Sequence, residues 1–265
     1  MAQREDEDRG FDQAARDFDR LGRHLWQPIG RETVRRTEPR TGERVLDACC
    51  GTGASAIPAA ERVGRDGAVD AVDVSEPLLE RLRGNGAHLP SLRAHRADIT
   101  TWEAGDYDLV QCVLGVFFLP DMAAGARHLI ARARRGGRVC FTIWRRGAMV
   151  DAGRRLQGAL ERVTGIAAGE RSGHLVDRVD EPDAFADWLR ELGLEQVRVT
   201  EAPLTLPVSE EIAWLVVTGS GFVAALNGLD DAQIDRVRVE YLRSFREDGV
   251  EALDATTLIG VGTRA

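Results

Sequence analysis

The chain has 265 residues, 43% of them hydrophobic and 29% charged, which suits one large α/β domain with a sizeable buried core. Its formal net charge of -8 opposes binding to nucleic acid, because neutralising phosphates requires an excess of clustered cations. All 35 cationic side chains are arginine, which excludes lysine Schiff-base chemistry and the P-loop lysine.

The first 42 residues divide into a polar tail and a helical cap. Residues 1–10 carry almost nothing apolar, so we expect a flexible tail there. Apolar side chains then recur at roughly helical spacing, at Phe11, Phe18, Leu21, Leu25 and Trp26. Pro28 should break this helix before a second, shorter one that runs through Val34.

Short apolar runs alternate with helical stretches between Glu43 and Trp144. The runs predict strands at 44–49, 68–73, 92–97, 107–114 and 137–144. Such alternation indicates a parallel sheet with helices on both faces.

The remaining sequence predicts two more strands, at 197–206 and 253–262, with helical segments around them. Helices are expected at 149–164, 182–192, 209–217, 220–226 and 230–246. The pattern indicates a late antiparallel strand and a helical lid. We expect a domain over 43–265, with lid segments near 149–173 and 209–246.

The strongest functional pattern is a glycine turn after the first strand. The run from Val45 to Asp47, apolar residues that end in an acid, predicts a buried strand. Gly51 and Gly53 follow this strand before a helix. These glycines permit backbone angles and a close approach that a Cβ would block. Since ligands of open parallel sheets bind beyond the carboxyl ends of the strands, we expect a nucleotide-like cofactor at this turn.

Acidic residues end the next two strands. Asp73 lies 20 residues after Gly53, a spacing that suits a carboxylate bound to ribose hydroxyls. Asp98 precedes Ile99, so its carboxylate could accept a hydrogen bond from the amino group of an adenine while the Ile99 side chain packs on the adenine ring. The alternative is capping, because Asp73 precedes a helix start at Ser75 and Asp98 could cap a turn. Acids and glycines at three consecutive strand ends favour a ligand site over capping alone.

The glycine turn also fits a nicotinamide-dependent oxidoreductase, because Gly51-x-Gly53-x-x-Ala56 with Asp73 satisfies the dinucleotide fingerprint. Three features lower this alternative. Asp47 lies inside the first motif, Asp98 adds a second acid directed at adenosine, and the late strands do not suggest a second mononucleotide-binding half.

Five segments resemble the class I S-adenosylmethionine-dependent methyltransferases, and more narrowly their UbiE-like bacterial small-molecule branch. They are Val45 to Gly53, Val72 to Ser75, Ala97 to Ile99, Tyr107 to Asp121, and Arg135 to Trp144. The chain departs from the branch at Arg135, where proline commonly stands, and at Val113, where glutamine is frequent. The resemblance implies a Rossmann-like, doubly wound α/β fold. Its mostly parallel seven-stranded sheet would have an antiparallel last strand, an N-terminal helical cap and a helical lid insertion.

The resemblance further implies S-adenosylmethionine as cofactor, with S-adenosylhomocysteine as its product. Gly51 and Gly53 would flank the methionine portion, and a carbonyl at Cys112 or Val113 would meet the ammonium group. Val74 would pack on the adenine face opposite Ile99, and the cap would close over the site. The implied cofactor residues are Trp26, Asp47, Cys49, Gly51, Gly53, Asp73, Val74, Asp98, Ile99, Cys112 and Val113.

The acceptor is expected to be a small, fairly apolar or aromatic metabolite of bacterial biosynthesis. The expected pocket residues are Phe117, Phe118, Trp144, Trp214 and Phe222, although lid packing explains Trp214 equally well. Methyl transfer from a sulfonium depends mainly on alignment and exclusion of water, so a base is optional. His24 and His174 are the candidate bases. A further alternative keeps the cofactor fold but uses the cofactor structurally or in another reaction.

Remaining features bear on metals, partners and location. The four cysteines lack metal-site spacing, so we expect buried reduced thiols and no metal. No apolar run is long enough to cross a bilayer and no signal peptide opens the sequence. We therefore expect a cytoplasmic monomer or homodimer that acts on a small molecule and binds neither nucleic acid nor membrane.

Overall fold

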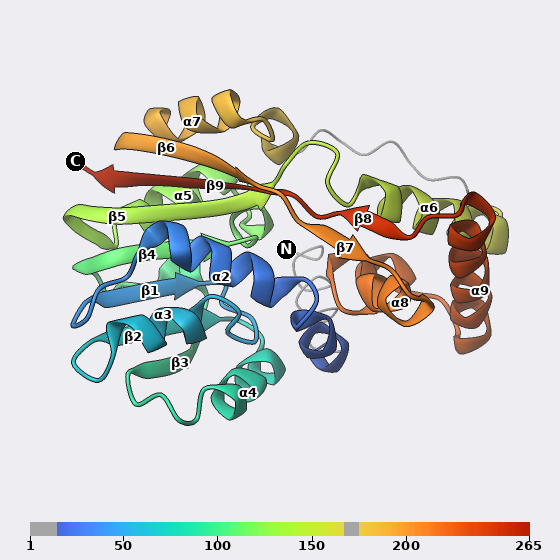
Figure 1. Ribbon diagram of the computed structural model, residues 1–265, viewed down its shortest axis with the longest axis horizontal. Coiled ribbons are helices and arrows are strands. Elements are labelled where there is room, and N and C mark those ends of the chain that lie inside the picture. The colour runs from blue at the N-terminus through green and yellow to red at the C-terminus, as the bar shows by residue number, and fades with distance from the viewer. Residues whose placement is uncertain (1–14, 167–174) are drawn as a thin grey trace.

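A computed structural model of the chain describes residues 15–166 and 175–265. The described residues form a seven-stranded sheet with helices on both faces (Figure 1). The strands are β1 (Arg44–Ala48), β2 (Ala68–Asp73), β3 (Leu92–Arg96), β4 (Tyr107–Val113), β5 (Ala133–Trp144), β6 (Leu194–Ala202) and β9 (Thr257–Arg264). Their order is β3-β2-β1-β4-β5-β9-β6, and β9 runs antiparallel to both of its neighbours. The predicted mostly parallel sheet with an antiparallel last strand is confirmed.

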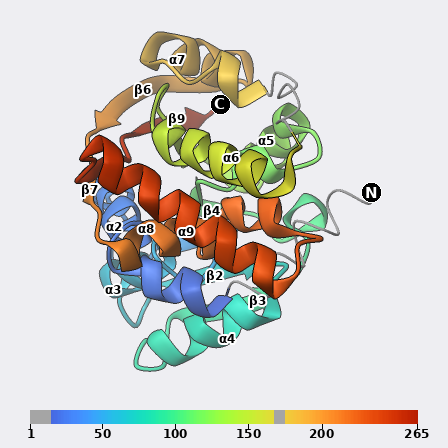
Figure 2. The same cartoon turned by 90° about the vertical axis from the view of Figure 1, so that its right-hand side faces the viewer.

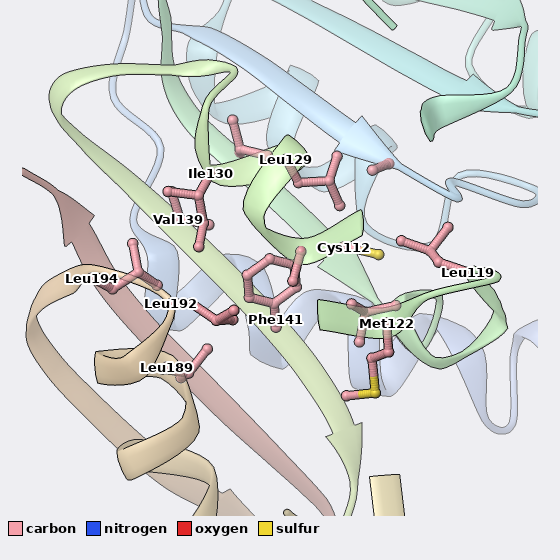
Figure 3. Close-up of a cluster of buried hydrophobic side chains, with 14 of the residues drawn as sticks. Cys112, Leu119, Met122, Leu129, Ile130, Val139, Phe141, Leu189, Leu192 and Leu194 are labelled. Carbon is pink, nitrogen blue, oxygen red and sulfur yellow. The ribbon is translucent and has the colours of Figure 1, made fainter. Parts of the chain in front are cut away.

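Apolar residues that alternate along the strands pack into two separate hydrophobic cores, one on each face of the sheet. Val45, Val69 and Leu109 pack with the helices α3 (Ala56–Val63) and α4 (Glu76–Asn85) on one face. Residues of the opposite phase, such as Leu46 and Val110, pack with α5 (Met122–Ile130) and α7 (Pro182–Glu191) on the other. Figure 3 shows this second core, in which Phe141 of β5 lies between the two helices.

The N-terminal cap consists of a helix at 15–22, a turn at 23–25 and α2 (Trp26–Thr37). The predicted break at Pro28 is wrong, because Pro28 is the third residue of α2 and the break falls at the turn before it. Amide groups of a helix's first turn have no partner within the helix, so proline is tolerated there. The helix also continues past Val34 to Thr37.

A lid lies beyond the carboxyl ends of the parallel strands (Figures 1 and 2). It contains α6 (Val150–Thr164), α8 (Glu210–Thr218), the 3-10 helix η4 (Gly221–Leu226), α9 (Asp231–Asp248) and the strand pair β7 (Thr205–Pro207) and β8 (Ala252–Asp254). These elements share a third core, to which the cap contributes Leu21, Leu25 and Ile29. Cap and lid are therefore packed together.

Two expected strands are each divided in the structure. The strand predicted at 197–206 is β6 followed by β7, and the one predicted at 253–262 is β8 followed by β9. Pro203 lies in the first gap, where its missing amide hydrogen prevents a continuous ladder. The sheet strands β6 and β9 thus lead into the lid strands β7 and β8. None of the helices within the described ranges is long and apolar enough to cross a membrane.

Candidate cofactor and acceptor site

The chain leaves β1 through a turn with left-handed backbone angles. Cys49, Gly51 and Gly53 have φ values of 56°, 52° and 92°. A Cβ at Gly53 would lie 2.2 Å from Cδ1 of Leu82, so only glycine fits there. Cys49 holds this conformation without being glycine, at a cost on the order of 1 kcal/mol. The turn presents bare backbone at the carboxyl end of β1.

Asp73, the last residue of β2, holds this turn in place. Its Oδ2 accepts a hydrogen bond from the Gly51 amide at 2.8 Å, and its Oδ1 accepts one from the Ser75 amide at 3.0 Å. The N-cap of α4 is Ser75, whose hydroxyl oxygen accepts from the Leu78 amide at 3.5 Å. Asp73 therefore faces the glycine turn and does not cap the helix.

Asp98 follows β3, the strand beside β2, and caps the short 3-10 helix η1 (Ile99–Thr101). Its Oδ1 accepts from the amide and the hydroxyl of Thr100, at 2.9 and 2.7 Å. Ile99 is almost fully buried in the core on the α5 face, whereas Val74 is half-buried. One oxygen of Asp98 thus caps η1, as the alternative interpretation predicts. Binding of an adenine by Asp98 stays a prediction.

Asp47 forms a fully buried polar group with Gln111 of the adjacent strand β4. Its Oδ2 accepts from Ser55 Oγ at 2.7 Å and from Gln111 Nε2 at 3.1 Å. Burial raises the pKa of Asp47 to about 7, although both hydrogen bonds act against the rise. Sequence reasoning missed Gln111, which a polar residue inside the apolar run of β4 could have revealed.

Aromatic side chains cover the glycine turn. A Cβ at Gly51 would lie 3.2 Å from Cε1 of Phe18, so this ring of the cap stands directly over the turn. Phe18 stacks on Trp26 with ring centroids 5.0 Å apart, and Trp26 lies 6.3 Å from Trp144 at the end of β5. Phe18 therefore stands over the turn, and Trp26 and Trp144 lie next to it in a chain of neighbouring aromatic rings.

Three buried polar atoms around this turn have no hydrogen-bond partner among the described residues. They are the donor Trp26 Nε1 and the acceptors Asp47 Oδ1 and Gln111 Oε1. A buried group left in this state is costly unless a ligand completes it. A free amino acid group offers both ammonium donors and carboxylate acceptors, so these atoms fit the methionine end of S-adenosylmethionine.

The end of β4 brings two thiols together. A Cβ at Gly115 would lie 2.9 Å from Cys49 Sγ and 3.0 Å from Cys112 Sγ. The hydrogen bond with Cys112, together with burial, raises the pKa of the Cys49 thiol well above its usual value. All four cysteines are free, three of them buried and Cys49 half-buried. Val113 is half-buried and packs against the lid core.

The five residues expected in the acceptor pocket fall into different surroundings. Trp144 lies beside Trp26, as described above. Phe118 of η2 (Val116–Phe118) is 39% exposed and lies 3.6 Å from the Cβ position of Gly221 in η4, and Phe117 packs beside it. Phe222 lies against Gly153 of α6.

Trp214 faces α9, where it contacts Tyr241 and Arg238. Its contacts are therefore lid packing. The assignment of these five residues to an acceptor pocket stays a prediction.

Of the two histidines proposed as candidate bases, only His24 lies within the described residues. His24 is half-buried in the turn at 23–25, between the two cap helices. His174 lies outside the described residues. Two other histidines have protein partners, since His95 Nε2 is 2.9 Å from Asp70 and His128 Nε2 is 3.0 Å from the Trp102 carbonyl. Within 15–166 and 175–265, no cluster of three or more His, Cys, Asp or Glu side chains is placed to hold a metal.

The region with this geometry matches known proteins. A family described as a methyltransferase domain matches residues 45–137, from β1 into β5. Aklanonic acid methyltransferase DauC of Streptomyces sp. (strain C5) is 39% identical over 136 residues, which cover 50% of this chain and 62% of DauC. Nocamycin O-methyltransferase of Saccharothrix syringae is 29% identical over 216 residues, which cover 74% of this chain and 75% of that protein.

A solved structure, the YcgJ protein from Bacillus subtilis, shares the fold at a TM-score of 0.56. It is 14% identical, and the alignment covers 90% of this chain and 98% of YcgJ.

Proposed function

Because the chain belongs to the class I S-adenosylmethionine-dependent methyltransferases, we propose that it transfers a methyl group from this cofactor to an oxygen of a small, fairly apolar acid. The names of the two relatives support the acceptor chemistry: one is an O-methyltransferase and the other acts on aklanonic acid. Matched segments cover 62% and 75% of these relatives, so the activity of the whole protein is inferred from part of each.

The arrangement that carries the proposal is the glycine turn with an acid at each of three neighbouring strand ends. Asp47, Asp73 and Asp98 end or follow β1, β2 and β3, which lie side by side. We assign Asp73 to the ribose and Asp98 with Ile99 to the adenine, with Val74 on the opposite face of the ring. Cys49, Cys112 and Val113 would border the methionine end.

When bound, S-adenosylmethionine would supply a methyl group on a sulfonium for in-line transfer to the acceptor oxygen, with S-adenosylhomocysteine as the product. The protein's part is to align the acceptor and to exclude water. Phe18 stands over the turn with Trp26 and Trp144 beside it, and we assign to the lid the closure of the opposite side. An acid reaches the site already deprotonated at neutral pH, so this acceptor needs no base.

The nicotinamide alternative is less favoured than methyl transfer, because the methyltransferase domain match begins at Val45 and includes the glycine turn, Asp73 and Asp98. A chain of this fold could still use the cofactor without transferring its methyl group. The direct experiment therefore has to follow the methyl group itself.

We would incubate the protein with S-adenosylmethionine that carries deuterium in its methyl group and with a panel of aromatic carboxylic acids and phenols. The proposal predicts a product that carries the deuterated methyl group, formed in equal amount with S-adenosylhomocysteine. Treatment of that product with mild alkali should release the methyl group if a carboxylate oxygen was the acceptor. Tight cofactor binding without labelled product across the panel would instead support the non-transfer alternative.

A further inference from the structure

The lid is joined to the sheet where three chain segments cross side by side. There β5 continues toward α6, β6 continues into β7, and β8 leads into β9 (Figure 1). Backbone hydrogen bonds link the crossing segments: the Ala255 amide donates to the Leu204 carbonyl at 2.8 Å, and the Arg145 amide donates to the Thr256 carbonyl at 3.1 Å. This crossing therefore ties the lid to the sheet through backbone contacts.

Arg145 connects the two sides of the crossing through its side chain. Its Nη2 donates to Oδ2 of Asp254, the last residue of the lid strand β8, at 2.7 Å. Its Nε lies 3.5 Å from Oε1 of Glu201, near the end of the sheet strand β6, which is a charge contact and not a hydrogen bond, since this Nε has no hydrogen-bond partner among the described residues. One guanidinium group thus bridges an acid of the lid and an acid of the sheet.

The segment after Arg145 is pinned to the same aspartate. The Met149 amide donates to the Asp254 carbonyl at 2.8 Å, and α6 begins at the next residue. Gly147 and Met149 have φ values of 87° and 59°. Met149 is therefore strained in the left-handed region, which persists only where surrounding contacts hold it.

The Arg145 ion pairs are weak enough to shift the position of the lid relative to the sheet without fixing it permanently. Arg145 is 30% exposed, Glu201 46% and Asp254 42%, and exposed ion pairs contribute little and are screened by salt. Partial burial opposes ionisation of Asp254, but hydrogen bonds from Thr256 and the charge of Arg145 keep its pKa below the usual range. The aspartate is therefore charged at neutral pH. Loss of a pair of this kind shifts an equilibrium on the order of fivefold.

We infer that Arg145 is a positioning residue that sets the lid against the sheet and thereby the fit of the acceptor. The lid carries Phe222, whereas the sheet carries Trp144 immediately before Arg145. A lid that opens more often would move Phe222 relative to Trp144, while Asp73 still holds the backbone of the glycine turn. The effect on the acceptor rests on the proposed function, whereas the effect on the lid does not.

Hydrogen exchange of backbone amides tests the lid directly, without acceptor or cofactor. In Arg145→Gln we expect amides of α6 and α8 to exchange on the order of fivefold faster, with amides of β1 and β4 unchanged. In the unaltered protein, raising NaCl from about 0.1 to about 1 M should speed lid exchange, because the pair is then screened. This salt effect should be smaller in Arg145→Gln, where only the other ion pairs of the lid, such as Arg246 with Glu210, remain to be screened.

Arg146 provides the matched control, because it is the next arginine and pairs with Asp180 and Glu181 outside the lid. Arg146→Gln should leave lid exchange and its salt dependence unchanged. Asp254→Asn should reproduce Arg145→Gln while keeping the Oδ1 that accepts from the Thr256 amide, and Arg145→Lys should recover part of the protection. Lid exchange equal to that of the unaltered protein, or equally accelerated exchange in sheet and lid, would overturn the inference.

Titration with S-adenosylhomocysteine and methyl transfer kinetics then separate this inference from the proposed function. Arg145→Gln should bind S-adenosylhomocysteine within about twofold of the unaltered protein while its acceptor KM rises on the order of fivefold. Failure of the unaltered protein to transfer a methyl group would contradict the proposed function and leave the exchange result standing. Faster lid exchange with an unchanged acceptor KM would show that Arg145 does not position the acceptor.

Discussion

Asp47 is a carboxylic acid that the fold takes completely out of water, with Ser55 and Gln111 as partners for one of its two oxygens. Burial raises its pKa from 3.8 to about 7, so the folded protein favours the protonated form more than the unfolded chain does. The resulting stability is fully present below about pH 4 and is lost as the pH rises through about 7.

We predict that stability against urea falls between about pH 5 and pH 8 and that Asp47→Asn reduces this fall. Each unit of pKa difference between the folded and unfolded states corresponds to about 1.4 kcal/mol, so the effect should amount to a few kcal/mol. The measurement is the free energy of unfolding of both proteins at the two pH values. An equally steep decline in Asp47→Asn would show that another group causes it.

Single residues differed in how well the sequence predicted their surroundings. The strand-end position of Asp73 could be predicted from the apolar run before it, and its hydrogen bond with the Gly51 amide places it at the glycine turn, while its role toward a ribose stays a prediction. The hydrogen bond between Asp47 and Gln111 could not be predicted from the sequence, because the two residues become neighbours only when β1 and β4 pair in the sheet. Phe18 was expected in the cap, but its position over Gly51 depends on how the cap folds back.

At the scale of elements, the site depends on how closely α2 approaches the glycine turn. A Cβ at Gly30 of α2 would lie 2.2 Å from the Ala54 carbonyl oxygen, so a larger side chain would push the helix away. That contact holds the cap helix against the segment between the turn and α3. It therefore links the cap to the candidate cofactor site.

We predict that Gly30→Ala destabilises the protein by about 1–3 kcal/mol and weakens S-adenosylhomocysteine binding, because overpacking moves α2 off the turn. Gly84→Ala is the control, since Gly84 is the next-to-last residue of α4 and its Cβ position has no neighbouring atom within 4 Å outside the backbone of its own helix and its two chain neighbours. This control should gain about 0.5–1 kcal/mol from the helix preference of alanine. Thermal unfolding and titration would check both, and an unaffected Gly30→Ala would contradict the packing described.

Element types in the first half of the chain were predictable because strand and helix periods alternate clearly there. Two differences from the expected elements have local causes: α2 tolerates Pro28 because it lies in the first turn of the helix, and Pro203 divides one expected strand into two. The division at the crossing beside Arg145 also creates the lid strand pair, whose three-residue members carry little pattern of their own.

At the scale of the whole molecule, the sheet order β3-β2-β1 brings the strands that carry or precede Asp98, Asp73 and Asp47 side by side. The parallel order could be predicted from alternation and from the family resemblance. The arrangement of the cap against the lid could not, because it depends on contacts between distant segments. Arg20 of the cap, for example, pairs with Glu211 of α8 at 2.8 Å.

The first helix of the cap, at 15–22, contacts both α4 and the lid. On one side the side-chain Nδ2 of Asn85 in α4 donates to Oδ1 of Asp19 at 3.1 Å, and on the other a Cβ at Gly219 would lie 2.6 Å from the carbonyl oxygen of Asp17. The cap is therefore held between α4 and the end of α8. Its place over the glycine turn follows from contacts with both α4 and the lid.

Calorimetric titration with S-adenosylhomocysteine tests the central claim, that the acid at the end of β2 and the glycine turn form a cofactor site. The unaltered protein should bind, and Asp73→Asn should weaken binding on the order of tenfold to a hundredfold, because hydrogen bonds to charged groups contribute about 1.5–3 kcal/mol. Asp66→Asn, which alters an exposed turn before β2, should bind as the unaltered protein does. Undiminished binding by Asp73→Asn, or no binding by the unaltered protein, would contradict the account.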